Sequence, residues 1–393
     1  MRYLSAHYVF PISSPPLKNG IICVGDDGSI IDVIDTGGKL EEREKLEFYN
    51  GILVPGFVNV HCHLELSHLR NAMTPHCGLP RFISYIGKLR IASRETILNT
   101  AKDADEEMTR NGIVAVGDIS NNAETLSVKR NSRIKYHTFI ELFGLDGNRS
   151  EEIFATAQLT KQEYEKVGMT ATMSPHAVYS VSQELWKLLI QSYTTSPPHV
   201  ISMHHQESSE EMNDFFDGKG ELSNMLKENG LNIPAKDTLS QVMRCFQEAT
   251  RCLLVHNIFS NSEDLLKYKS VPERFYFVLC PVSNMFIQNT LPNLQLFLLP
   301  YLSQHTCLGT DSLASNTSLS ILNEMKIIQN HLPEISLETL LQWATINGAK
   351  ALGFDDFCGS IERNKTPGIN LITGIDFDNM RLTANSAVIP LSG

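Results

Sequence analysis

The chain has 393 residues, with 42% hydrophobic residues, 20% charged residues and a formal net charge of -11 at pH 7. This composition is typical of a folded globular protein, and the acidic balance argues against a nucleic-acid partner, because proteins that bind nucleic acid carry basic surfaces. No stretch approaches the ~18 consecutive apolar residues that a membrane helix needs, and the eight cysteines include no CxxC pair. We therefore expect a cytoplasmic protein with reduced thiols that binds neither nucleic acid nor membrane, while a homodimer is left open.

Both ends of the chain carry short segments with strand character. Near the N-terminus, Ile21–Val24 and Ser29–Ile34 flank an Asp-Asp-Gly turn signal. Near the C-terminus, Ile369–Ile372 follows a group of polar turn residues. We expect the two ends to pair as a small accessory β-sandwich domain, made of residues 1–50 and 356–393.

Between these ends, over residues 51–355, short apolar runs alternate with segments of helical periodicity. Eight runs are predicted as strands: Ile52–Phe57, Ile113–Val116, Ile134–Ile140, Met169–Met173, Val200–Met203, Leu253–Val255, Phe275–Leu279 and Thr306–Gly309. Helices are expected over Phe82–Ala92, Gln183–Gln191, Leu239–Ala249 and Ile321–Gln329. The alternation favours parallel strands joined by helical crossovers, and one barrel of this kind needs about 250 residues. The predicted fold class is α/β, a TIM-like (β/α)₈ barrel with an accessory domain, and a doubly wound sheet is the alternative.

Nearly every predicted strand ends in a side chain that can bind a metal or move a proton. These residues are His61 and His63, Asp118, Glu141, His176, His204, His256 and Asp311. The carboxyl-terminal strand ends of a barrel build its active site and gather such side chains at one mouth. A doubly wound sheet concentrates its chemistry at a single crevice instead. The spread over the strand ends therefore favours the barrel.

The strongest local signal is the His-x-His pair that follows the first apolar run. Side chains at positions i and i+2 of a strand point to the same side, so His61 and His63 can reach one ion. A chance pair on a surface strand is the competing interpretation. The apolar strand directly before the pair argues against it.

Three further strand ends supply candidate ligands and a proton carrier. His204 ends an apolar run and has Glu207 three residues later, and His205 is the competing ligand. His256 also ends an apolar run, where a buried structural histidine is the alternative. Asp311 lies in a Gly-Thr-Asp-Ser turn, where an N-cap for the next helix is the alternative. The four positions in barrel order are more specific than any one of them alone.

Three histidines and a carboxylate suit zinc, or another first-row metal such as iron, with one position open for water. An ion held there lowers the pKa of a bound water toward neutrality. No lysine is evidently placed to bridge a second metal, so we expect one divalent ion. The sequence contains no His-Glu-x-x-His, no phosphate-binding loop and no Gly-x-Ser-x-Gly motif.

These motifs resemble those of the amidohydrolase superfamily, in its metal-dependent deaminase and chlorohydrolase branch. The segment Pro55–Leu64 resembles the first-strand motif, and the motifs around His204, His256 and Asp311 resemble those of strands five, six and eight. The resemblance covers essentially the whole chain. The tail after Thr366 departs from it, because it lacks the usual Ala-Asp-Leu.

Within that branch, the segments His61–Ser67 and Ser174–Ser182 are most similar to aminodeoxyfutalosine deaminases and adenosine-type deaminases. The resemblance implies metal binding by four residues: His61, His63, His204 and Asp311. It also implies that His256 orients the attacking water, and whether His256 ligates the metal as well stays open. Contact with the substrate is implied for His176 and Glu65.

Together these residues predict a metal-dependent hydrolase that acts on non-peptide C–N bonds. Its expected reaction is hydrolytic removal of an amino group from a small purine-like or nucleoside-like heterocycle. Asp311 accepts a proton from the attacking water, Glu207 protonates the adjacent ring nitrogen, and His256 bonds to the new oxygen as ammonia leaves.

Two other functions compete with deamination. The same site could hydrolyse another C–N bond or a carbon–halogen bond on a small heterocycle. The other class is a non-catalytic metal-binding protein of the same fold. Glu207 argues against that class, since a scaffold needs no proton carrier.

Overall fold

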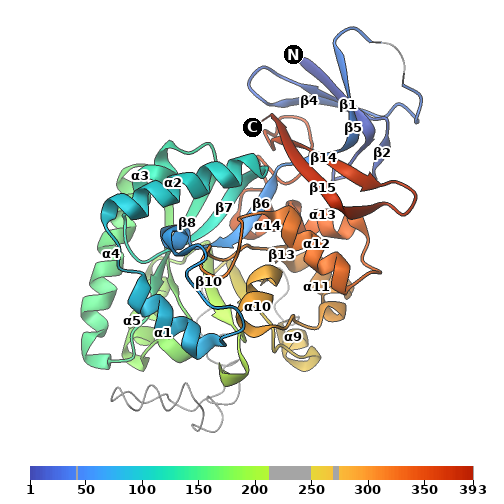
Figure 1. Ribbon diagram of the computed structural model, residues 1–393. Coiled ribbons are helices and arrows are strands. Elements are labelled where there is room, and N and C mark those ends of the chain that lie inside the picture. Colours follow the sequence, from blue (N-terminus) through green and yellow to red (C-terminus); the bar gives the residue numbers. More distant parts are fainter. Residues whose placement is uncertain (41–42, 212–248, 269–273, 393) are drawn as a thin grey trace.

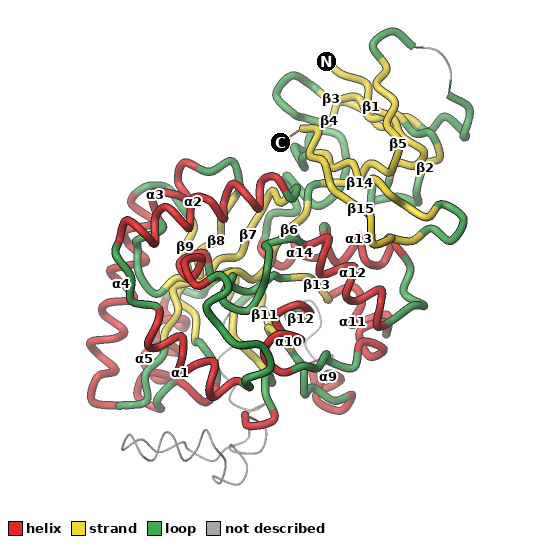
Figure 2. The backbone as a smooth tube through the Cα atoms, in the orientation of Figure 1, coloured by secondary structure: helices red, strands yellow, loops and turns green. Residues whose placement is uncertain are grey.

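The computed structural model describes residues 1–40, 43–211, 249–268 and 274–392. Helices surround a group of parallel strands, and a further sheet built from both chain ends lies beside them (Figures 1 and 2). The helix predicted over Leu239–Ala249 falls outside the described residues, apart from Ala249.

The two ends of the chain meet in one seven-stranded sheet (Figure 1). Its strands are β1 (Arg2–Val9), β2 (Leu17–Lys18), β3 (Ile21–Val24), β4 (Ile30–Ile34), β5 (Leu46–Pro55), β14 (Ile369–Asp376) and β15 (Arg381–Ser392). They follow the order β15-β14-β5-β1-β3-β4, with β2 paired to β1. Only the β1–β5 pair is parallel among these strands. The two chain ends therefore pair, as expected from their strand signals.

The apolar run Ile52–Phe57, predicted as the first barrel strand, is divided between two sheets. Its first part belongs to β5, which pairs with β1 and β14 in the sheet of the chain ends. Strand β6 (Phe57–Cys62) then begins the parallel strands. Gly56 lies at the junction, where a Cβ atom would come within 2.6 Å of the Pro367 carbonyl oxygen. The prediction of one continuous strand was wrong because residues 52–57 are buried on both sides of the junction, so the apolar pattern does not reveal the change of sheet. The sheet of the chain ends therefore continues to Pro55, beyond residue 50.

The parallel strands form two sheets of four. One contains β6, β7 (Ile113–Ser120), β8 (Lys135–Leu142) and β9 (Thr170–Pro175), and the other contains β10 (Val200–His205), β11 (Arg251–His256), β12 (Phe275–Leu279) and β13 (Thr306–Leu308). Isolated parallel bridges join the sheets at both edges, Ala177 to His204 and Cys62 to Asp311. Because all eight strands run in the same direction, their carboxyl ends open on one side.

Helices cover the outside of the parallel strands (Figure 1). They are α1 (Leu79–Leu89), α2 (Arg94–Arg110), α3 (Leu126–Asn131), α4 (Ser150–Lys166), α5 (Gln183–Thr195), α9 (Ser262–Tyr268), α10 (Pro281–Gln288), α11 (Pro300–His305), α12 (Ile321–His331), α13 (Leu337–Ala344) and α14 (Ile346–Leu352). Short 3₁₀ turns are η1 (Leu64–Leu69), η2 (Gly147–Arg149), η3 (Val178–Ser180) and η4 (Leu294–Leu298).

The predicted helices in the described part of the chain are present. Helices α5 and α12 begin where the patterns predict, after Ser182 and Ser320, whose side chains accept backbone N–H groups of the first turn. Helix α1 begins three residues before the predicted start at Phe82, because Pro80 occupies its first turn and Gly78, with φ +74°, precedes it.

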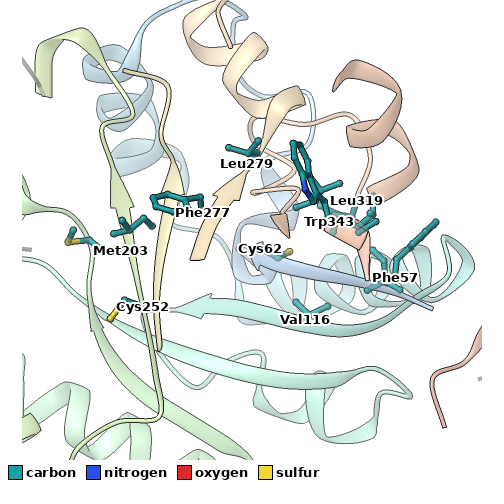
Figure 3. Close-up of a cluster of buried hydrophobic side chains, with 14 of the residues drawn as sticks. Phe57, Cys62, Val116, Met203, Cys252, Phe277, Leu279, Leu319 and Trp343 are labelled. Atoms are coloured by element: carbon teal, nitrogen blue, oxygen red, sulfur yellow. The ribbon is translucent and has the colours of Figure 1, made fainter. Parts of the chain in front are cut away.

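The hydrophobic core joins the parallel strands to the helices around them. Figure 3 shows Phe57 of β6 and Val116 of β7 in the same cluster as Trp343 of α13, and all three are fully buried. The indole N–H of Trp343 donates to the Ser303 carbonyl at 3.0 Å, so its polar atom is satisfied inside the core. This packing holds the strand ends in fixed positions.

Buried His137 of β8 makes folding stability depend on pH. Burial, with a smaller contribution from His199, lowers its pKa to about 3. Between pH 3 and 6.5 the unfolded chain binds this proton and the folded chain does not. Within that window, each unit by which the pH falls therefore lowers the free energy of unfolding by about 1.4 kcal/mol through this residue.

We expect His137→Gln to lose less stability than the wild type when the pH is lowered from 6.5 to about 4.5, as urea midpoints measure. The exposed His331→Gln is the matched control and should keep the wild-type dependence. If the stability of His137→Gln fell with pH as much as that of the wild type, buried His137 would not be a source of the pH dependence.

Candidate metal centre

His61 and His63 converge at the end of β6. Their Nε2 atoms lie 3.2 Å apart, although His61 is fully buried and His63 is partly exposed. Burial, reinforced by the neighbouring His63, keeps the pKa of His61 well below its ordinary value. His61 is therefore neutral, which is the form that binds a metal. The i, i+2 spacing places both rings as expected.

Asp311 approaches this pair from the loop after β13. Its Oδ1 lies 3.9 Å from His61 Nε2 and 3.6 Å from His63 Nε2. Its backbone N–H donates to the His61 carbonyl at 3.0 Å, and its φ is +56°, a left-handed conformation that costs energy outside glycine. Such strain at a carboxylate between two histidines indicates a functional site.

Hydroxyl groups hold the Asp311 carboxylate in place. Its Oδ2 accepts from Ser283 Oγ at 2.6 Å and from Ser315 Oγ at 2.8 Å, while its Oδ1 accepts from the Ser312 N–H at 2.7 Å. Burial raises the pKa of Asp311, but the nearby histidines, led by His63, and the Ser283 hydroxyl outweigh burial and lower it. Asp311 is therefore an ionised carboxylate.

His204 supplies a third ring from the end of β10. Its Nδ1 lies 3.1 Å from the His176 carbonyl oxygen, so this nitrogen carries the proton and Nε2 keeps a lone pair for a metal. The ring centroid lies 4.9 Å from that of His61. His205 is excluded as the ligand, since its two ring nitrogens lie 3.0 Å from Asn257 Oδ1 and 3.0 Å from the Tyr268 hydroxyl.

His256 completes the group from the end of β11. Its φ of +77° is again left-handed, and its Nδ1 lies 2.8 Å from Asn284 Oδ1, which orients the ring. Its Nε2 is buried, makes no hydrogen bond with the described residues, and lies 3.6 Å from Glu207 Oε1. The ring therefore directs a free nitrogen toward the other histidines and Glu207.

The donor atoms fit a divalent metal. Among the described residues, three sets of donor atoms each lie within 4.8 Å: His61 with His204 and His256, His61 with His63 and Asp311, and Glu141 with His176 and His204. Buried Nδ1 of His61 and Nε2 of His256 form no hydrogen bond in the described part of the chain, and buried polar atoms normally find a partner. Imidazole nitrogens with one carboxylate are the ligands of catalytic zinc. His256 belongs to one of these sets, so its geometry is compatible with either ligation or water positioning.

Glu207 lies beside this group as a buried carboxyl. Burial raises its pKa, which His256 partly offsets, so Glu207 holds a proton more readily than an exposed glutamate. The turn that carries it is held by Glu211, whose carboxylate accepts the backbone N–H groups of Glu207 at 2.8 Å and Gln206 at 3.1 Å. This arrangement suits a proton carrier.

A cavity of about 260 Å³ opens beside these residues. Six predicted site residues line it: His63, His176, His204, Glu207, His256 and Asp311. Apolar side chains line it as well, with Leu79, Phe82, Ile83 and Ile86 from one face of α1, and Phe143 and Leu145 from the loop after β8. The cavity therefore combines reactive side chains with an apolar wall.

Glu65, predicted to contact the substrate, is not among the described residues that line this cavity. Its carboxylate accepts from Arg90 Nη2 at 3.1 Å and from the Asn121 N–H at 3.0 Å, and both of those residues do line the cavity. Burial raises the pKa of Glu65 to about 7, against the opposing effect of Arg90. The role of Glu65 stays a prediction, and its contacts place it behind the cavity wall.

The lining residues that were not predicted as site residues include Arg90, Asn121 and Glu141. Asn121 links the other two, because its Oδ1 accepts from Arg90 Nη2 at 2.6 Å and its Nδ2 donates to Glu141 Oε2 at 2.9 Å. Glu141 was noticed as a strand-end carboxylate, which is the signal for it. Arg90 follows α1, far from any strand end, and has no such signal.

A comparison with protein families and known proteins agrees with this geometry. The model of the amidohydrolase family matches residues 52–388. The chain belongs to the amidohydrolase family. In the described residues no helix is both long and apolar enough to cross a membrane.

Similar amidohydrolases include named deaminases. The aminodeoxyfutalosine deaminase of a Nitratiruptor species is 30% identical over 82% of this chain and 79% of its own length. The structure of Helicobacter pylori aminofutalosine deaminase with methylthio-coformycin aligns with a TM-score of 0.80 at 24% identity, covering 95% of this chain and 92% of that one. An adenosine deaminase of Xanthomonas campestris with bound zinc aligns with a TM-score of 0.74 at 19% identity, covering 98% and 89%.

Proposed function

We propose that this amidohydrolase is a zinc-dependent deaminase of adenine nucleosides that carry an apolar 5′ substituent, with aminodeoxyfutalosine-type compounds among its substrates. The observation that carries the proposal is that residues of a histidine–carboxylate centre and Glu207 line the same cavity as a group of apolar side chains. Deaminase names among the relatives support the reaction.

The chain's own residues can perform the proton transfers of hydrolytic deamination. The Lewis acidity that makes water nucleophilic near neutral pH comes from the divalent ion when it is bound. Asp311, ionised and fixed by Ser283 and Ser315, accepts the proton of the attacking water. Glu207 delivers its proton to the ring nitrogen beside the carbon under attack. His256, oriented by Asn284, bonds to the oxygen that becomes attached to that carbon. As the C–N bond then breaks, Asp311 passes its proton to the departing amino group, which leaves as ammonia, and the proton of the new hydroxyl group returns to Glu207.

The lining of the cavity argues against a nucleotide substrate. Among the described residues that line it, Arg90 carries the one guanidinium, and no lysine is present. The Arg90 charge is already paired with Glu65. A 5′-phosphate would therefore meet apolar side chains and no unpaired lysine or arginine, whereas an alkylthio or aryl group gains from leaving water.

A single ion is the simplest occupant of the centre. Two of the three donor sets share His61, and His204 joins one of these to the third set, which contains Glu141 and His176. The Nδ1 of His204 is engaged by the His176 carbonyl, which leaves His204 one nitrogen for a metal. The zinc bound in the Xanthomonas relative supports zinc over iron.

We also infer that the two parallel sheets close into one eight-stranded barrel, with the seven-stranded sheet as an accessory domain. The bridges at both edges support this closure. The two-layered sandwich, the boundary at residue 356, the cytoplasmic location and a homodimer stay predictions.

Ammonia release tests the proposed function. Zinc-loaded protein should release ammonia faster from 5′-methylthioadenosine and aminodeoxyfutalosine than from adenosine 5′-monophosphate, and metal-stripped protein should release none. Protein that holds zinc at one ion per chain but releases no ammonia from any of them would sink the proposal. Faster turnover of the monophosphate would refute the apolar 5′ preference.

A further inference from the structure

A fully buried ion pair lies behind the metal centre and has no part in the proton transfers. Lys129 of α3 and Asp118 at the end of β7 form this pair, and both side chains are 0% exposed. The Lys129 ammonium also lies 2.8 Å from Ser120 Oγ and 4.9 Å from the centre of the Tyr164 ring. Burial lowers the pKa of Lys129, but Asp118 and Tyr164 outweigh burial and raise it, so the lysine is charged.

The other oxygen of Asp118 reaches the chain next to a metal ligand. Asp118 Oδ1 accepts the backbone N–H of Leu64 at 2.8 Å, and Leu64 follows His63 directly. Leu64 is the first residue of η1, whose N-cap residue is His63, and His63 makes no side-chain cap to this turn. The carboxylate of Asp118 therefore performs, from a neighbouring strand, the capping that the turn itself lacks.

This contact joins the two halves of the site. His63 faces Asp311 and His61, while Glu65, one residue after Leu64, holds Arg90 and Asn121 at the cavity wall. Holding the N–H of Leu64 in place therefore orients the backbone on both sides of it, and with it the side chains of His63 and Glu65.

We propose that Asp118 is a positioning residue that holds His63 in the geometry of the metal centre, and that Lys129, through its ion pair with Asp118, holds the carboxylate in place for this contact. The proposal rests on the metal centre of the proposed function. A buried ion pair is in itself weak evidence for stability, since apolar side chains of similar volume often replace one at no loss. The hydrogen bond to Leu64 is what an apolar pair could not supply.

Two double variants separate positioning from packing. Asp118→Asn with Lys129→Met removes both charges but keeps an amide oxygen for the Leu64 N–H. Asp118→Leu with Lys129→Met removes both charges and the acceptor. The readout is the zinc dissociation constant, from competition with a chromophoric chelator, together with the melting temperature of the metal-free protein.

We expect the zinc affinity to fall about 10- to 100-fold in Asp118→Leu with Lys129→Met, as it does when other residues that orient metal ligands are removed. In Asp118→Asn with Lys129→Met it should stay within about threefold of the wild-type value. Leu189→Ala, which removes a buried side chain of α5 away from the centre, is the control for lost stability and should keep wild-type zinc affinity.

Equal zinc affinities in the two double variants would overturn the inference. If the Leu/Met variant does not fold, Asp118→Asn and Asp118→Ala are compared in the same way, because both leave Lys129 unpaired and differ in the acceptor for Leu64. Wild-type protein that binds no zinc would instead refute the proposed function itself, so the two failures are distinct.

Discussion

Replacing Glu207 by Gln should lower the rate of ammonia release by about 10²–10⁴-fold and leave the metal bound, because a well-placed general acid contributes that much. Gln keeps the volume of the side chain but cannot deliver a proton. Glu207 is buried, its pKa is raised by burial, and its Oε1 lies 3.6 Å from His256. Steady-state ammonia release and zinc content, measured on the same preparation, report the two effects separately.

Glu210→Gln is the matched control, since it makes the same change three residues along, outside the cavity lining. It should keep both the rate and the metal. A Glu207→Gln variant with the wild-type rate would remove Glu207 from the mechanism. Loss of zinc together with activity would instead make Glu207 a determinant of the metal centre.

Replacing Lys129 by Met should lower the free energy of unfolding by about 3–5 kcal/mol, because it leaves the Asp118 charge buried without its partner. The methionine fills most of the space of the lysine chain, so lost packing contributes little. Urea denaturation of the metal-free protein measures the effect. Adding Asp118→Asn to Lys129→Met should recover much of the loss, since no unpaired charge then remains.

Lys161→Met is the control for removing a paired lysine at the surface. Lys161 lies 2.6 Å from Glu165 on α4, and their side chains are 31% and 47% exposed. An exposed pair of this kind contributes about 0–1 kcal/mol, so the midpoint should barely move. If Lys129→Met and Lys161→Met lowered the free energy of unfolding by similar amounts, the buried pair would contribute no more to stability than the surface pair.

The candidate centre was predictable because its members lie in the last residues of a strand or shortly after its end. His61, His204 and His256 end apolar runs that are easily recognised as strands, and parallel strands bring their carboxyl ends to one side. The structure does bring these histidines together with His63 and Asp311. The spacing to Glu207 favoured His204 over His205 as the ligand, and the hydrogen bonds of both ring nitrogens of His205 agree with that choice.

The substrate wall was not predictable in the same way. Arg90 follows a helix, and its place in the cavity depends on how α1 lies over the strand ends. Glu65 was expected to contact the substrate; it accepts a hydrogen bond from Arg90, which lines the cavity, and its contact with the substrate stays a prediction. The division between β5 and β6 was also hidden, because an apolar pattern records burial and not which sheet a strand joins.

By itself, the sequence determined the alternation of strands and helices, the pairing of the two chain ends and the identity of the donors at the strand ends. These features are local, since each depends on residue type, periodicity and position after an apolar run. Only the tertiary structure decided which nitrogens are free, which carboxyls are buried enough to hold a proton, and that Asp118 reaches the N–H beside His63. Those properties depend on distances between residues far apart in the chain, and packing alone sets such distances.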